Sequence, residues 1–116
     1  MTLKLCVALL LVAATPIGGN ESLRLSVFPQ MATQPAVVNV RVSIEPDDEN
    51  RAIQIIAESA DYFRSSQVQL DGTNATRTST FQYRDLPAGE YAVRGTLIGR
   101  DGHQRAVAIG RLVVMP

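Results

Sequence analysis

Apolar and polar side chains alternate with a period of two in this chain, and that alternation restricts its fold more than any other feature. The clearest run covers residues 38–45, where valine or isoleucine takes each even position and a polar residue each odd one. Successive side chains of a β-strand point to opposite faces, so this run predicts a strand with one buried and one solvated face. Residues 23–27 and 90–97 repeat the pattern, which predicts an all-β protein.

Turn residues separate the predicted strands. One such turn is Gly99-Arg100-Asp101-Gly102, where Gly102 would supply the positive φ of a tight hairpin. The predicted strands are residues 23–27, 38–44, 53–57, 62–70, 76–83, 90–97 and 104–114. Residues 52–61 also fit a helix, because Ile53, Ile56 and Ala57 fall at helical spacing. Seven short strands in about 95 residues favour a single antiparallel β-sandwich.

Residues 1–19 have the order of a secretory signal peptide. A positively charged start is followed by an uncharged apolar run over residues 5–14 and then by residues that break a helix. Cleavage is expected after Ala14 or near Gly19. The run is shorter than the roughly 20 residues of a spanning helix, so no transmembrane span is expected after cleavage. We therefore expect an exported protein, periplasmic or extracellular, whose domain covers residues 20–116.

Composition excludes several classes of protein. Cys6, the only cysteine, lies in the predicted signal peptide, so the mature domain has no disulfide and must be held by its core. The chain has 11 basic and 11 acidic residues. Removal of Lys4 leaves 10 basic residues against 11 acidic ones, a net charge near −1. No basic block occurs, which argues against nucleic acid as a partner.

Leu86-Pro87-Ala88-Gly89-Glu90-Tyr91 has the pattern of a tight turn that feeds a strand. Together with the strands around it, the segment resembles the closing half of immunoglobulin-like and fibronectin type III-like domains of secreted bacterial proteins. That resemblance implies an immunoglobulin-like sandwich with a tyrosine corner, in which the buried Tyr91 hydroxyl bonds to nearby backbone and Gly89 allows the turn. Disulfide-bonded relatives have a cysteine where this chain has Val93. Residues 81–91 also resemble carboxypeptidase regulatory-like, prealbumin-type domains, which are the second candidate.

A run of acidic residues lies between the second and third predicted strands. Asp47, Asp48 and Glu49 are candidates for binding calcium through carboxylate oxygens. Their spacing does not match the alternating donors of known calcium loops, and such a run ordinarily forms a solvated turn. The sequence therefore predicts no metal site, and it contains no cofactor signature.

The only histidine, His103, follows Asp101 in a predicted turn. A serine–histidine–aspartate triad would need a serine on a shaped turn to meet this pair. No such motif surrounds Ser65 or Ser66. The sequence therefore predicts no catalytic residue.

Two aromatic and two basic residues are candidates for binding. Tyr62 and Phe63 stand at the boundary of a predicted strand. Burial at one end of the sandwich is the favoured interpretation, whereas exposure would make them a binding patch. Arg94 and Arg105 are predicted on the outward faces of neighbouring strands, where they would either grip an anionic partner or solvate the sheet.

The sequence thus predicts an exported, non-catalytic accessory or binding module that presents loops or an edge strand to a protein or glycan partner. This role follows from the fold by analogy. One alternative is a subunit of an envelope hydrolase with an acidic site built from Asp47, Glu49 and Asp101. Another is a structural protein that self-associates weakly by edge pairing of the strand at residues 104–114.

Overall fold

The computed structural model describes residues 19–20 and 22–116. Within them, one short 3₁₀ helix, η1 (Gly72–Asn74), accompanies nine β-strands. The predicted signal peptide lies outside the described residues, apart from Gly19. The described part of the chain has no helix that is long and apolar enough to cross a membrane.

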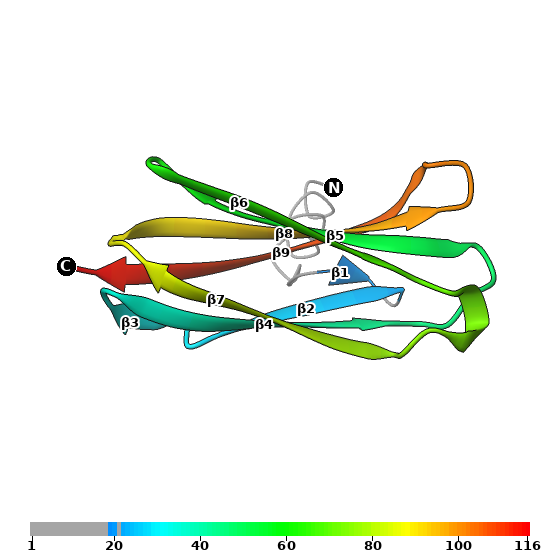
Figure 1. Ribbon diagram of the computed structural model, residues 1–116, viewed down its shortest axis with the longest axis horizontal. Coiled ribbons are helices and arrows are strands. Elements are labelled where there is room, and N and C mark those ends of the chain that lie inside the picture. The colour runs from blue at the N-terminus through cyan, green and yellow to red at the C-terminus, as the bar shows by residue number, and fades with distance from the viewer. Residues whose placement is uncertain (1–18, 21) are drawn as a thin grey trace, which may run out of the picture.

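The strands form two facing sheets. Figure 1 shows β2 and β4 in the lower layer and β5, β6 and β8 in the upper layer. The four-stranded sheet has the order β1 (Gly19–Asn20), β2 (Leu23–Phe28), β4 (Ala36–Ile44) and β7 (Thr78–Leu86). The five-stranded sheet has the order β3 (Met31–Thr33), β9 (Gln104–Met115), β8 (Gly89–Gly99), β5 (Asn50–Ser59) and β6 (Tyr62–Gln69). The predicted all-β sandwich is confirmed, and the seven longer strands correspond to the seven predicted ones.

Two features of the sheets differ from the prediction. β1 and β3 were not predicted, and β3 pairs with β9 in the parallel direction, so the sandwich is not purely antiparallel. β3 has only three residues between Pro29 and Pro35, too few to display a period of two. The helical alternative for residues 52–61 is wrong, because most of that segment belongs to strand β5.

Inward side chains of both sheets meet in one core. Along β4 the alternation is as predicted, with Val38, Val40, Val42 and Ile44 exposed by 6% or less. Tyr91 of β8 is 2% exposed, and its hydroxyl donates a hydrogen bond to the carbonyl of Pro87 over 2.6 Å. This is the geometry of a tyrosine corner, and burial raises the pKa of the Tyr91 phenol.

β2 packs closely on β8 and β9 of the opposite sheet. A Cβ placed on Gly110 would lie 2.8 Å from Cγ2 of Val27 and 2.9 Å from Cδ2 of Leu25. A Cβ on Gly95 would lie 2.8 Å from Cδ1 of Leu25. Both glycines therefore serve the packing of the two sheets rather than a turn.

The two turn glycines have positive backbone angles. Gly102, in the β8–β9 hairpin, has a φ of +80°, and Gly89, at the start of β8, has a φ of +156°. L-residues with a side chain rarely adopt either value. Asp85, just before the β7–β8 turn, adopts a φ of +57° without being glycine.

Candidate functional site

Apart from Arg94, which lies midway along β8, the predicted site residues are divided between the two ends of the sandwich. The β4–β5 loop, η1 and the tip of the β8–β9 hairpin lie at one end, on the right in Figure 1. The β5–β6 hairpin and the β7–β8 turn lie at the opposite end. Asp47 and Asp101 are therefore far from Tyr62, and the candidates do not form one site.

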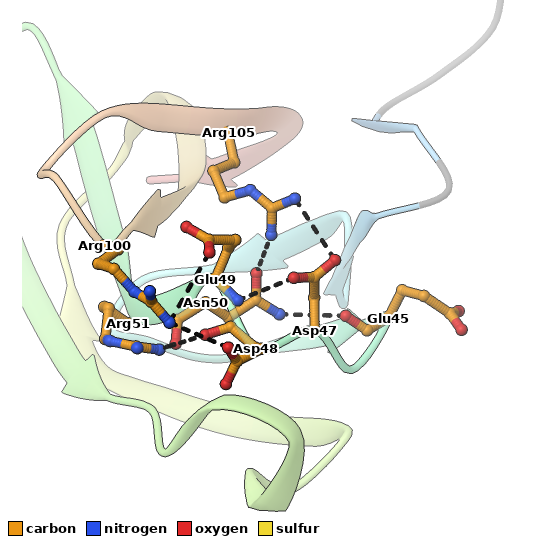
Figure 2. A network of polar contacts seen from close by, with 8 residues as sticks. All are labelled: Glu45, Asp47, Asp48, Glu49, Asn50, Arg51, Arg100 and Arg105. Carbon is orange, nitrogen blue, oxygen red and sulfur yellow. Dashed lines mark hydrogen bonds and ion pairs between the residues drawn. The ribbon is translucent and has the colours of Figure 1, made fainter.

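A buried amide organises the first end. Asn50 is fully buried, the one polar side chain in the described residues with that degree of burial. Its Nδ2 donates to the carbonyl of Glu45 over 3.1 Å, and its Oδ1 accepts from Nη1 of Arg105 over 2.6 Å. Nη2 of the same arginine lies 3.5 Å from the carboxylate of Asp47 (Figure 2). Arg105, one of the predicted binding residues, fastens the β4–β5 loop to β9.

The three calcium candidates are likewise tied to protein groups. Asp47 accepts a hydrogen bond from the backbone N–H of Glu49 over 2.8 Å. Arg100, from the β8–β9 hairpin, lies 2.9 Å from Asp48 and 3.7 Å from Glu49 (Figure 2). The described residues contain no group of three histidine, cysteine, aspartate or glutamate side chains placed to hold a metal ion. The acidic run is thus a loop neutralised by arginine rather than an open set of oxygen ligands.

The pKa of Asp47 gives a test of this network. The N–H of Glu49 lowers the pKa of Asp47, and the Arg105 guanidinium lowers it further. We expect carbon-detected NMR to show a titration midpoint below about 3.9, the ordinary aspartate value. A lowered pKa in the folded state adds stability that is complete above the unfolded pKa and is lost as the pH falls through the folded one. The midpoint should rise in Arg105→Gln, and an ordinary midpoint in the native chain would contradict the network.

His103 and the two serines do not meet. His103 lies 4.0 Å from Asp101 in the β8–β9 hairpin, and both side chains are more than three-quarters exposed. The two serines lie midway along β6, where Ser66 accepts a hydrogen bond from the Tyr83 hydroxyl over 3.1 Å. The geometry of these residues therefore does not assemble a triad.

Exposed apolar side chains gather on the outer face of the five-stranded sheet. The described residues expose seven large apolar side chains. The register places five of them on this outer face: Met31, Phe63, Ile109, Val113 and Met115. We call this surface the apolar face. Patches of this kind on a soluble domain commonly mark an interaction surface.

Four charged side chains share the apolar face. Ala92 of β8 lies between Arg111 of β9 and Glu58 of β5 in the register. Two residues away along β8 on either side are Arg94 and Glu90, which point to the same face because side chains alternate. None of the four forms an ion pair within 4.0 Å in the described part of the chain. Their charges are thus available to a partner.

A hollow of about 350 Å³ opens on the apolar face beside the β5–β6 hairpin. The small side chains of Ala60 and Ala92 contribute to its lining, together with Glu58, Glu90 and Arg111. It lies next to the tyrosine corner, since Tyr91 also lines it.

The outer face of the four-stranded sheet is different in character. Polar residues dominate it, including Asn39, Ser43 and Thr80. Its largest exposed apolar side chain, Phe28, lies beneath the guanidinium of Arg41, 5.8 Å from the ring centre. The two faces of the sandwich are therefore not equivalent.

The aromatic candidates have separate environments. Tyr62 is partly buried, with its ring edge against Tyr91 at a centroid distance of 5.6 Å. Phe63 is 63% exposed, so the expected burial of this pair is wrong for Phe63. Neighbouring residues of a strand point to opposite faces, so the two side chains could not both be buried.

Sequence reasoning identified Phe63 and Arg94 on the apolar face but missed its remaining members. One signal was present in β9, where the outward residues Val107, Ile109 and Val113 are apolar, as are the inward ones. A strand that is apolar on both faces indicates a partner on its outer side.

Comparisons with known proteins identify the fold alone. No protein-family model matches the chain. No curated protein matches it either. A superoxide reductase (neelaredoxin) from Ignicoccus hospitalis is 14% identical, with a TM-score of 0.64 over 83% of this chain and 82% of that one. The sulfur carrier protein SoxY from Chlorobium limicola f thiosulfatophilum is 16% identical, with a TM-score of 0.60 over 100% of both chains.

A third similar structure is a PKD domain of an M14-like peptidase from Thermoplasmatales archaeon SCGC AB-540-F20. It is 13% identical, with a TM-score of 0.57 over 88% of this chain and 100% of that one. A reductase, a carrier and a domain of a peptidase share this sandwich, so the likeness supports the architecture and no single activity.

Proposed function

We propose that this protein is an exported, non-catalytic binding module that contacts a protein partner through its apolar face. The observation that carries the proposal is the concentration of exposed apolar side chains on one sheet, five of the seven in the described residues. Large apolar anchors surrounded by charged residues are typical of protein interfaces. The polar outer face of the other sheet offers no comparable surface.

A protein fits the apolar face better than a glycan does. The exposed phenylalanines of the described residues are Phe28 and Phe63, and they belong to the outer faces of different sheets. They cannot form one aromatic platform for a sugar ring. The methionines and branched aliphatic residues suit the irregular apolar surface of a protein.

The strand order supports an immunoglobulin-like arrangement within the sandwich. In such domains the strand with the tyrosine corner lies between the third strand and the last strand of the domain. Here β8 carries the corner and lies between β5, the third of the seven long strands, and β9, the last, while β2, β4 and β7 lie with β1 in the opposite sheet. We favour this assignment over the prealbumin-type alternative.

The hydrolase alternative has less support. Asp47 and Glu49 are each bound to arginine, and Asp101 is exposed on a hairpin. Glu58 and Glu90 both line the open hollow on the apolar face. A hydrolytic activity lost in Glu58→Gln would favour the enzyme and contradict the binding module.

Site-specific crosslinking tests the proposed function. A photo-reactive amino acid is introduced at Ile109 on the apolar face, and at Arg41 on the opposite face as the matched control. We expect the exported chain to form a discrete crosslinked product from position 109 and none from position 41. Equal products from both positions, or none from either, would contradict a binding surface on this face. Fractionation of the same cells tests export.

A further inference from the structure

We propose that the partner of the apolar face is a second copy of this chain, packed face to face about a two-fold axis that crosses the five-stranded sheet diagonally. In this dimer Arg94 of each copy meets Glu58 of the other, and Arg111 meets Glu90. The inference rests on the proposed function and names the partner.

The arrangement of charges around Ala92 carries the inference. In the register, Arg111 and Glu58 flank Ala92 on the neighbouring strands, while Arg94 and Glu90 lie two residues away along β8 on opposite sides. Arg94 lies between Ile109 and Ile56 in the register, so neither of its cross-strand neighbours is acidic. The two basic side chains therefore occupy one side of a diagonal line through Ala92, and the two acidic ones occupy the other.

Apolar residues occupy the diagonal itself. The line that separates the charges passes through Ile56 of β5, Ala92 of β8 and Val113 of β9. A two-fold rotation about this line places each of these residues against its own copy and exchanges the basic side with the acidic side. Such an interface is isologous, because the same patch serves both copies. In this interface each of the two arginines meets a glutamate of the other copy, and no two of the four charged side chains of like sign come into contact.

The hollow has a matching occupant in this arrangement. The same rotation carries Ile109 toward the β5–β6 hairpin of the other copy, where Ser59 and Ala60 line the hollow. Ile109 is 46% exposed, so its side chain is available to enter. The strands of the two copies cross near a right angle, which is one of the two common ways that sheets pack.

The size of the face is sufficient for a stable dimer. The five strands of the sheet hold 3, 12, 11, 10 and 8 residues, 44 in all. At about 3.3 Å per residue and about 4.8 Å between strands, they cover roughly 700 Å² on each copy. A standard protein–protein interface buries about 600–1,000 Å² per partner, so the face falls within that range.

Edge pairing through β9 would produce a different dimer. β3 covers β9 only at residues 113–115, which leaves residues 104–112 as a sheet edge in the described part of the chain. Pairing along that edge uses backbone hydrogen bonds and does not depend on the four charges. Charge reversal therefore separates the two modes of association.

The test is sedimentation of the exported chain, as the host releases it, over a range of concentrations. We expect a monomer–dimer equilibrium that Arg94→Glu or Glu58→Arg weakens by at least about tenfold, because like charges then meet across the interface. The double variant R94E/E58R should restore the native affinity, since the exchanged charges pair again. Arg41→Glu, on the opposite face, should leave it unchanged.

Restoration by the double variant excludes a folding defect as the cause of the weakening. A dimer that neither reversal weakens would overturn the inference in favour of the β9 edge. A chain that stays monomeric at its highest soluble concentration would also overturn it. In that case a crosslink from position 109 to a different protein would leave the proposed function intact.

Discussion

Replacing Gly110 with valine is expected to lower the free energy of unfolding by about 3 kcal/mol, at the upper end of the usual cost of overpacking a core. The native Cα has no room for a side chain, because a Cβ would lie 2.8 Å from Cγ2 of Val27 and 2.9 Å from Cδ2 of Leu25. The leucine tip can rotate away, whereas the methyl of valine is fixed close to the backbone of β2. Urea denaturation followed by circular dichroism measures the loss.

A series at the same position controls for this effect. Gly110→Ala should cost less than Gly110→Val, and adding Val27→Ala should recover part of the loss by removing the contacted methyl group. Thr96→Val, at a partly buried position on the outer face of β8, should remain close to the native stability. Native stability of Gly110→Val would show that β2 does not lie as close to β9 as described.

Replacing Asn50 with leucine is expected to cost about 2–3 kcal/mol, because a part-buried carbonyl and a part-buried guanidinium lose their hydrogen-bond partner. The amide of Asn50 joins the carbonyl of Glu45 to the guanidinium of Arg105 in a fully buried position. Leucine has a similar volume but can satisfy neither group. The free energy of unfolding from thermal or chemical denaturation measures this loss.

Two variants show whether the loss comes from the hydrogen bonds. Asn50→Asp keeps an acceptor for Arg105 but sets a carboxylate against the carbonyl of Glu45, so it should also destabilise the fold. Asp48→Asn removes one partner of an exposed ion pair and should change stability by no more than about 0.5 kcal/mol. If Asn50→Leu is no less stable than Asp48→Asn, the buried amide does not organise the loop.

The long strands could be predicted because apolar and polar side chains alternate along most of them with a period of two. That alternation shows which face of the strand is buried. The run at residues 38–45 needs no knowledge of its neighbours, since valine and isoleucine on one face already imply a core. β3 could not be predicted in this way, because three residues between prolines carry no period. Its parallel pairing with β9 depends on where the chain crosses from one sheet to the other.

The roles of the charged residues could not be predicted from local sequence. Arg105 has the appearance of an outward strand residue, yet it binds Asn50, which is 55 positions away in the sequence. From local sequence, the acidic residues at 47–49 have the pattern of a solvated turn or a calcium loop. In the fold they form ion pairs with Arg100 and Arg105, which belong to the β8–β9 hairpin. Contacts of this kind are set by which loops share an end of the sandwich.

The sequence by itself determined that the chain forms an all-β sandwich, because the alternation of side chains is a property of each strand alone. The order of strands in the sheets decided the rest. It packed β2 against Gly110 and placed most of the predicted site residues at two opposite ends of the sandwich. It also brought Arg111, Arg94, Glu58 and Glu90 together around Ala92. A surface formed by several strands exists only after the strands are aligned, so no single segment of the sequence could reveal the apolar face.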